Sequence, residues 1–315
     1  MNPSLSSVNA NSSSVIASEA KQSLKDLIYT SFEKTRFRRA IWDRVMVYVL
    51  SLCALSILFI LFIILIHLFI QGVSSLNWDF FTQLPKPVGE KGGGMANAIV
   101  GTLTLLGLAV CVGVPIGLGA GVYLSEYAHQ NFAQVVRFVA DVMNGIPSIV
   151  YGIFAYIVCV LPLKSFSALS GGFALGIMMI PMITRTSEQF VRMVPSQLRE
   201  AGLALGVPKW RVTVDIVIPS ALAGITTGIM VALARVAGET APLLFTAFGN
   251  HYWQRSLTQP IAALPLQVFT YAIAPFDDWH RQAWAGAIVL ILMVLIINGW
   301  AQFYVMRRNR WASGK

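Results

Sequence analysis

Residues 199–219 read REAGLALGVPKWRVTVDIVIP and lie between two long apolar stretches of the chain. Apolar residues alternate with small ones up to Val207, Pro208 interrupts the run, and basic and aromatic residues follow. This pattern predicts a short helix, a break and a second helix. Small residues allow close backbone approach, and an exposed apolar face rimmed by charge suits docking to another protein. The alternative is an ordinary amphipathic connector at the membrane surface.

The composition around this loop is that of an integral membrane protein. Of 315 residues, 56% are hydrophobic and only 12% are charged, about half the charged fraction of a soluble domain. Several apolar stretches reach the roughly 20 residues that a helix needs to cross a membrane. We therefore expect an all-α protein with six transmembrane helices, at about 45–70, 98–124, 138–162, 171–193, 218–247 and 283–305. Asp141, Asn144 and Pro147 interrupt the third of these.

Basic residues gather on one side of the membrane if the chain crosses it six times. They precede the first span, fill the loop after the fourth and end the chain, which predicts that both termini are cytoplasmic. The net charge of +9 has the same origin, so we expect no nucleic-acid partner. The aromatic outer loop at 248–282 is expected to lie partly in the membrane interface.

These patterns divide the chain into segments. The first 24 residues are rich in Ser and Asn without apolar periodicity, which is typical of disorder. The expected segments are a disordered tail at 1–24, a basic cytoplasmic segment at 25–44, a first transmembrane helix at 45–72, a permease-like core at 92–305 that includes the loop 195–219, and a basic cytoplasmic tail at 306–315.

The loop resembles the coupling loop of ABC-type importer permeases, whose pattern is E-A-A-x3-G-x9-I-x-L-P. The chain departs from this pattern in having Gly for the second Ala and Ile for the Leu. The resemblance implies a type I importer permease fold and a coupling helix seated in a cleft of a cytoplasmic ATPase. The residues that it assigns to coupling are Glu200, Ala201, Gly202, Gly206, Pro208, Trp210, Ile216 and Pro219.

Arg235 and Glu239 lie within the fifth apolar stretch, where ionisable side chains are costly and usually functional. At a spacing of four residues they share one face of a helix. They could form a structural ion pair between packed helices. Alternatively, the forked guanidinium could bind a tetrahedral oxyanion while Glu239 orients it. Arg185 and Glu188 form a second charged pair, for which snorkelling to the interface is the competing interpretation.

The third span contains the polar stretch MNGIPSIVYG at 143–152. Pro147 removes one backbone hydrogen bond, and the freed groups must be covered by protein or face a wet cavity. Asn144 and Ser148 flank this proline and are candidates to line such a cavity. A simple packing kink is the alternative.

Beyond the loop, the sequence is similar to the A-type permease subunit of phosphate-specific importers over roughly 92–302. The stretches that carry this likeness are 145–152, 183–211, 234–247 and 259–272. The resemblance implies phosphate import with a homologous C-type permease, two copies of an ATPase and an external phosphate-binding protein. It places the substrate path at R-x-x-x-E-T-A-P; the candidate path residues are Arg235, Glu239, Thr240, Arg185, Asn144 and Ser148.

The chain lacks a G-x-x-x-x-G-K-[ST] stretch, so ATP and Mg²⁺ are expected on the partner ATPase and no cofactor on this chain. Neither the three cysteines nor the four histidines are spaced as metal ligands, and no H-E-x-x-H occurs. We therefore expect a transport subunit without catalytic residues, and not an intramembrane enzyme. A secondary transporter is disfavoured by the single specialised loop. A permease for another oxyanion, such as sulfate or molybdate, remains the alternative function.

Overall fold

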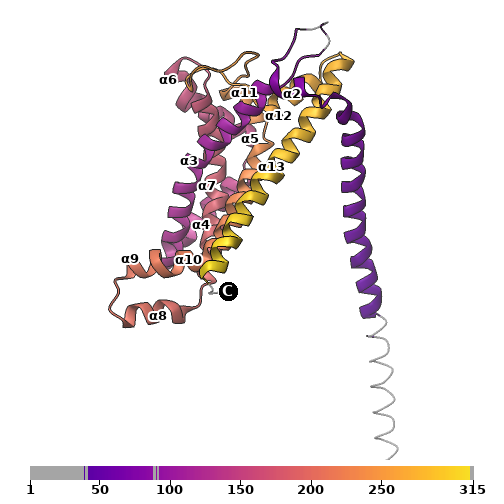
Figure 1. The fold of residues 1–315 in the computed structure, drawn as a ribbon. Helices are drawn as coiled ribbons and strands as arrows, with labels where there is room; N and C mark the ends of the chain where they lie inside the picture. Colours follow the sequence, from indigo (N-terminus) through magenta and orange to yellow (C-terminus); the bar gives the residue numbers. More distant parts are fainter. Residues whose placement is uncertain (1–38, 40–41, 88–89, 91, 313–315) are drawn as a thin grey trace, which may run out of the picture. The chain divides into compact units, whose positions relative to one another are not determined.

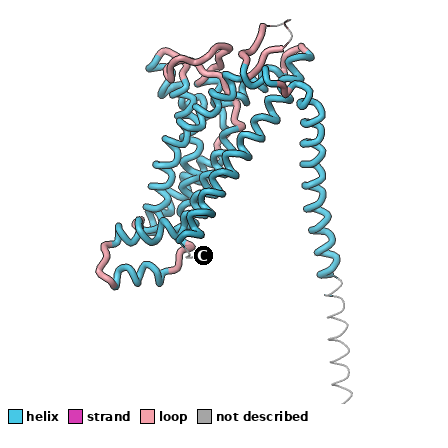
Figure 2. Tube along the Cα trace, viewed as in Figure 1, coloured by secondary structure: helices cyan, strands magenta, loops and turns pink. Residues whose placement is uncertain are grey.

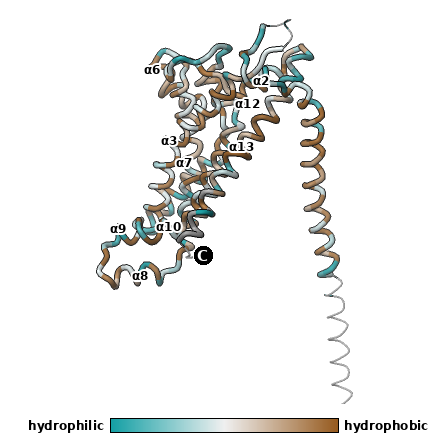
Figure 3. Tube along the Cα trace, in the orientation of Figure 1, coloured by the Kyte–Doolittle hydropathy of each residue, from teal (hydrophilic) through white to brown (hydrophobic). Residues whose placement is uncertain are grey.

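The computed structural model describes residues 39, 42–87, 90 and 92–312. The predicted tail at 1–24 and most of the basic segment at 25–44 lie outside the described residues. The chain divides into two units, Met1–Ile66 and His67–Lys315. The first unit contributes most of the helix Trp42–Ser75, which is apolar except near its ends (Figure 3) and ends in the turn η1 (Val73–Ser75). This helix includes the predicted first span.

The second unit is a bundle of helices with loops at both ends (Figures 1 and 2). Five helices in the described part of the chain are long and apolar enough to cross a membrane, or six with one bent pair, in agreement with the predicted all-α class. The elements after η1 are α2 (Trp78–Thr82), α3 (Ala96–Glu126), α4 (Gln130–Gly145), α5 (Ser148–Ala155), η2 (Tyr156–Val160), α6 (Leu161–Leu163), α7 (Ala168–Arg192), α8 (Ser196–Ala204), α9 (Lys209–Arg211), η3 (Val212–Val217), α10 (Ile218–Ala237), α11 (Ala241–Thr246), α12 (Leu264–Ala272) and α13 (Asp277–Ala312).

Helices α3 and α7 form the central pair of the bundle. Glycines spaced by four residues on α3 let the two backbones approach closely, as small residues do in membrane helix pairs. A Cβ atom at Gly113 would lie 2.8 Å from the Cβ of Met179, and one at Gly117 would lie 2.8 Å from the Cβ of Ile183. Helix α10 also packs on α7, because Gly228 on α10 faces Thr186 on α7. Helix α7 is therefore the element on which α3, α4, α5 and α10 assemble, whereas α13 packs on α10 and α12.

The predicted third span, 138–162, is wrong as a single helix. Helix α4 begins at Gln130, ends at Gly145, and is followed by a second helical stretch, Ser148–Leu163, at an angle of 101°. The bend falls at Ile146 and Pro147, because residues that precede a proline disfavour helical dihedrals. Ile146 accordingly has an extended backbone, with φ −69° and ψ 133°.

The predicted fifth span, 218–247, also differs from the structure. Its helix begins earlier, at Lys209, and ends at Ala237, where Gly238 caps it. A separate short helix, α11, follows with a proline in its first turn. In the outer region at 248–282, the structure has helix α12 and the first residues of α13, and α13 continues into the predicted basic tail as far as Ala312.

Candidate functional site

The first candidate site is the break between α10 and α11, which carries three of the predicted path residues. Arg235 lies in the last turn of α10, while Glu239 and Thr240 lie beyond its C-cap. The break is held to the rest of the fold because the Thr240 hydroxyl donates to the Pro265 carbonyl at 3.4 Å. Arg235 and Glu239 thus lie where the backbone leaves helical geometry between two packed segments.

Arg235 and Glu239 do not form the ion pair that their spacing allowed. The helix ends between them, so the i, i+4 geometry is lost. Among the described residues, Arg235 has no acidic partner, and its side chain is exposed on this single chain. Glu239 is half-buried. The interpretation as a structural ion pair is therefore wrong, and the guanidinium remains available to another group.

The bend between α4 and α5 lies beside this break. In a continuous helix the Met143 carbonyl would accept a bond from residue 147, which is a proline without an N–H. That carbonyl accepts instead from the Ile146 N–H at 3.1 Å and from the Tyr151 hydroxyl at 2.6 Å. A Cβ at Gly152 would lie 2.8 Å from the Cα of Pro242, which brings α5 against α11.

The approach of Gly152 to Pro242 places the bend and the break next to each other. Asn144 and Ser148, on either side of the bend, are both half-buried. Five of the six predicted path residues therefore lie at two neighbouring helix breaks.

Arg185, the sixth, lies elsewhere. Its neighbour Thr186 packs against Gly228, which is seven residues before Arg235 on α10, or about 10 Å along the helix axis. The Arg185 Nε donates to Asp141 Oδ1 at 2.9 Å, and its Nη1 donates to Glu188 Oε2 at 3.0 Å. This guanidinium is engaged by carboxylates and is not brought to Arg235.

Glu188 is the centre of a charge cluster of which only the pair with Arg185 was predicted from the sequence. Its side chain is 2% exposed and, besides Arg185, it accepts from Arg137 Nε at 2.6 Å and pairs with Arg192 Nη2 at 3.1 Å. With Asp141, the cluster holds three positive and two negative charges. Sequence patterning offered one signal, since Arg137 and Asp141 are four residues apart on α4, but not their partner on α7.

The second candidate site is the loop between α7 and α10, which has the predicted helix, break and helix. Helix α8 ends in a Schellman motif, in which the Gly206 N–H donates to the Leu203 carbonyl at 2.9 Å and the Val207 N–H donates to the Gly202 carbonyl at 3.3 Å. Gly206 has φ +77°, a conformation that glycine adopts without strain. Pro208 then caps the second helix, which begins at Lys209. The motif glycine is therefore required by backbone geometry.

The other motif residues fold the loop back on itself and leave its tip exposed. Gly202 is buried, and a Cβ there would lie 2.9 Å from Val212 and 3.1 Å from Ile216. This close packing accounts for glycine in place of the usual alanine. The exposed motif residues are Glu200, Ala201, Gly206, Pro208, Trp210 and Pro219. Leu203, Leu205 and Trp210 are 49%, 83% and 58% exposed, an apolar surface at the end of the molecule where α13 also ends (Figure 1).

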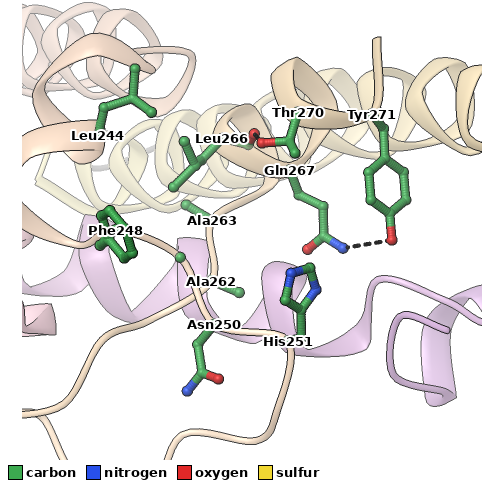
Figure 4. Close-up of a pocket in the computed structure, with 11 residues that line it drawn as sticks. Leu244, Phe248, Asn250, His251, Ala262, Ala263, Leu266, Gln267, Thr270 and Tyr271 are labelled. Carbon is green, nitrogen blue, oxygen red and sulfur yellow. Dashed lines mark hydrogen bonds between the residues drawn. The ribbon is translucent and has the colours of Figure 1, made fainter. Parts of the chain in front are cut away.

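A cavity of 270 Å³ lies between α11 and α12, at the opposite end of the bundle. Its polar groups include His251 and the Gln267 amide, which donates to the Tyr271 hydroxyl at 3.3 Å (Figure 4). Burial raises the pKa of the Tyr271 phenol, so this hydroxyl stays neutral at physiological pH. No lysine or arginine lines this cavity, and it is therefore poorly suited to an anion.

Comparison with known proteins agrees with this arrangement. Residues 113–310 match the family described as binding-protein-dependent transport system inner membrane component. The chain is 43% identical over 242 residues to the phosphate transport system permease protein PstA of Yersinia pestis, covering 76% of this chain and 82% of the relative. It is 44% identical over 241 residues to PstA of Xylella fastidiosa strain Temecula1, covering 76% and 84%.

A solved bacterial ABC transporter involved in the import of the acidic polysaccharide alginate has a chain of the same fold. The TM-score is 0.60 at 15% identity, over 86% of this chain and 99% of that one. The bundle and its loop therefore define a multi-pass inner-membrane permease of an ABC-type importer, with the predicted type I fold. More particularly, the chain belongs to the family of phosphate transport system permease proteins PstA.

Proposed function

We propose that this chain is a permease subunit of an ATP-driven phosphate importer and that Arg235 lies on the phosphate path. The assignment of phosphate as the substrate is supported by the sequence identity of 43–44% with PstA permeases over three quarters of the chain. A path residue for an oxyanion needs a charge that no internal partner neutralises. Arg235 meets this requirement among the described residues, because it is exposed and lacks an acidic partner.

The chemistry of the two breaks fits a phosphate group. A guanidinium offers five donors in a planar fork that matches tetrahedral oxyanions. Thr240, Asn144 and Ser148 add short polar groups at the two breaks, and Glu239 lies at the same break as Arg235 without pairing with it. Arg185, about 10 Å closer to the loop, does not meet the requirement for an unneutralised charge, because Asp141 and Glu188 pair with it.

The partners follow from the exposed loop and from the incomplete site. The apolar tip formed by Leu203, Leu205 and Trp210 docks on a separate ATPase dimer that binds ATP and Mg²⁺. A homologous C-type permease completes the path, and an external phosphate-binding protein delivers the anion. The loop and both termini are then cytoplasmic. ATP binding favours the outward-open state by several kcal/mol, as reversal of a two-state population requires.

Uptake of labelled phosphate by cells that express the assembled complex tests this proposal. Arg235→Gln is compared with wild type at matched membrane levels, and Arg255→Gln, an exposed arginine of the outer loop, is the control. Loss of a charge-assisted contact to the substrate lowers uptake about tenfold or more. Wild-type uptake by Arg235→Gln would remove Arg235 from the path. If excess sulfate or molybdate suppresses the uptake and excess unlabelled phosphate does not, the substrate of the importer is that other oxyanion and not phosphate.

A further inference from the structure

Glu126, the last residue of α3, is bound by the helix α8 of the loop. The Arg199 guanidinium donates to Glu126 Oε1 from Nη2 at 2.7 Å and from Nε at 3.0 Å. The Glu126 side chain is only 7% exposed. A charge-assisted fork of this kind is about twice as strong as a neutral hydrogen bond and fixes orientation as well as distance. The loop is therefore bound through side chains to α3, a helix that it neither follows nor precedes directly in the sequence.

The same guanidinium also ties α8 to the end of α7. Arg199 Nη1 donates to the Val194 carbonyl at 2.6 Å, and Nη2 donates to the Val191 carbonyl at 2.8 Å. Carbonyls at the C-terminal end of a helix lack intrahelical partners and attract positive charge. One side chain of α8 thus contacts the ends of both central helices.

The loop has two arms, α8 before the break and α9 with η3 after it. The second arm also reaches the C-terminal end of α3. Lys209, the first residue after the break, donates from Nζ to the Glu126 carbonyl at 2.5 Å and lies 4.7 Å from the centre of the Tyr127 ring. The Tyr127 hydroxyl is 3.3 Å from Thr213 Oγ1. Both arms therefore converge on residues 126 and 127, while the tip at Leu203 and Leu205 is exposed.

We propose that Glu126 is a positioning residue that passes displacement of α8 to α3 during transport. This inference rests on the proposed coupling role of the loop. Chain connectivity carries motion of the loop into α7 and α10, but α3 is reached through the side chains of Arg199 and Lys209. Because Gly113 and Gly117 pack α3 tightly on α7, the two helices respond as one body when both ends are held.

The test measures ATP hydrolysis and phosphate uptake by the full complex in proteoliposomes supplied with the external phosphate-binding protein. Glu126→Gln keeps the shape of the side chain and removes its charge. We expect assembly and ATP hydrolysis to be retained, and phosphate moved per ATP hydrolysed to fall about tenfold, the factor that loss of a charged hydrogen bond supplies. Asp215→Asn is the matched control, since Asp215 is exposed on the same loop and pairs with no base among the described residues.

Two results would overturn the inference: an unchanged ratio of transport to hydrolysis in Glu126→Gln, or an equal fall of both activities in an assembled complex. Failure of the wild-type complex to take up phosphate would instead contradict the proposed function. If Glu126→Gln does not assemble, Lys209→Gln decides, because it removes the second arm's contact and leaves the carboxylate in place. A drop of about threefold in phosphate per ATP is then expected, and an unchanged ratio overturns the inference.

Discussion

The carboxylate of Glu188 on α7 lies 2.6 Å from the Nε atom of Arg137 on α4. Two further arginines, Arg185 and Arg192, contact the same carboxylate. A buried charge is tolerated only when it is paired and hydrogen-bonded. In this permease, one acidic side chain holds three bases that would otherwise repel each other, and it fixes the amphipathic helix α4 to the central helix of the bundle.

Glu188→Gln is therefore expected to lower the free energy of unfolding by about 3–5 kcal/mol, the usual cost of removing one partner of a buried ion pair. Denaturation of the purified complex in detergent measures the change. Asp141→Asn is the control, because Asp141 is 56% exposed and contacts only Arg185 in this cluster. Its loss costs less than about 1 kcal/mol. Equal effects of the two substitutions would show that burial of Glu188 does not determine the stability of α4.

The glycines of α3 permit a comparison between two positions that are two residues apart. Gly117→Ala places a Cβ 2.8 Å from the Cβ of Ile183, whereas a Cβ at Gly119 has no atom within 4 Å. We expect Gly117→Ala to destabilise the fold by about 1–3 kcal/mol through overpacking. Gly119→Ala should be neutral or slightly stabilising, because alanine is the better helix former. Thermal melting of both variants in detergent distinguishes the two effects, and similar melting temperatures would contradict the close α3–α7 contact.

The sequence predicted four of the six spans and the helix, break and helix of the loop well, because apolar length, proline and the motif glycines act locally. Gly206 and Pro208 each dictate the backbone at their own position. The apolar run continues through Gly238, so the sequence indicates one helical face for Arg235 and Glu239, whereas the helix ends between them. The contact of Glu188 with Arg137 was also missed, since Arg137 lies 51 residues away along the chain. Such contacts depend on helix packing, which apolar periodicity does not specify.

The Schellman turn of the loop gives a third prediction. Gly206 has φ +77°, which a β-branched residue adopts only with strain, whereas asparagine tolerates it. Gly206→Val should weaken binding of the permease to its ATPase about tenfold, corresponding to the roughly 1–2 kcal/mol cost of this conformation. Gly206→Asn should retain most of the affinity. Co-purification of the ATPase with each variant at matched expression measures the difference, and equal retention would mean that the turn is not needed for docking.

The bend between α4 and α5 gives the last prediction. Proline at 147 offers no N–H to the Met143 carbonyl, and the Tyr151 hydroxyl donates to it at 2.6 Å. Tyr151→Phe removes this donor without changing the ring, so we expect a loss of about 1 kcal/mol in the free energy of unfolding. Tyr156→Phe is the control, because the Tyr156 hydroxyl has no hydrogen-bond partner within the described structure. The bend lies beside the break that carries Arg235, because Gly152 approaches Pro242. A bend that shapes the phosphate path would therefore lower uptake in Tyr151→Phe by more than the stability change explains, whereas a bend that only packs α5 on α11 would leave uptake per folded complex unchanged.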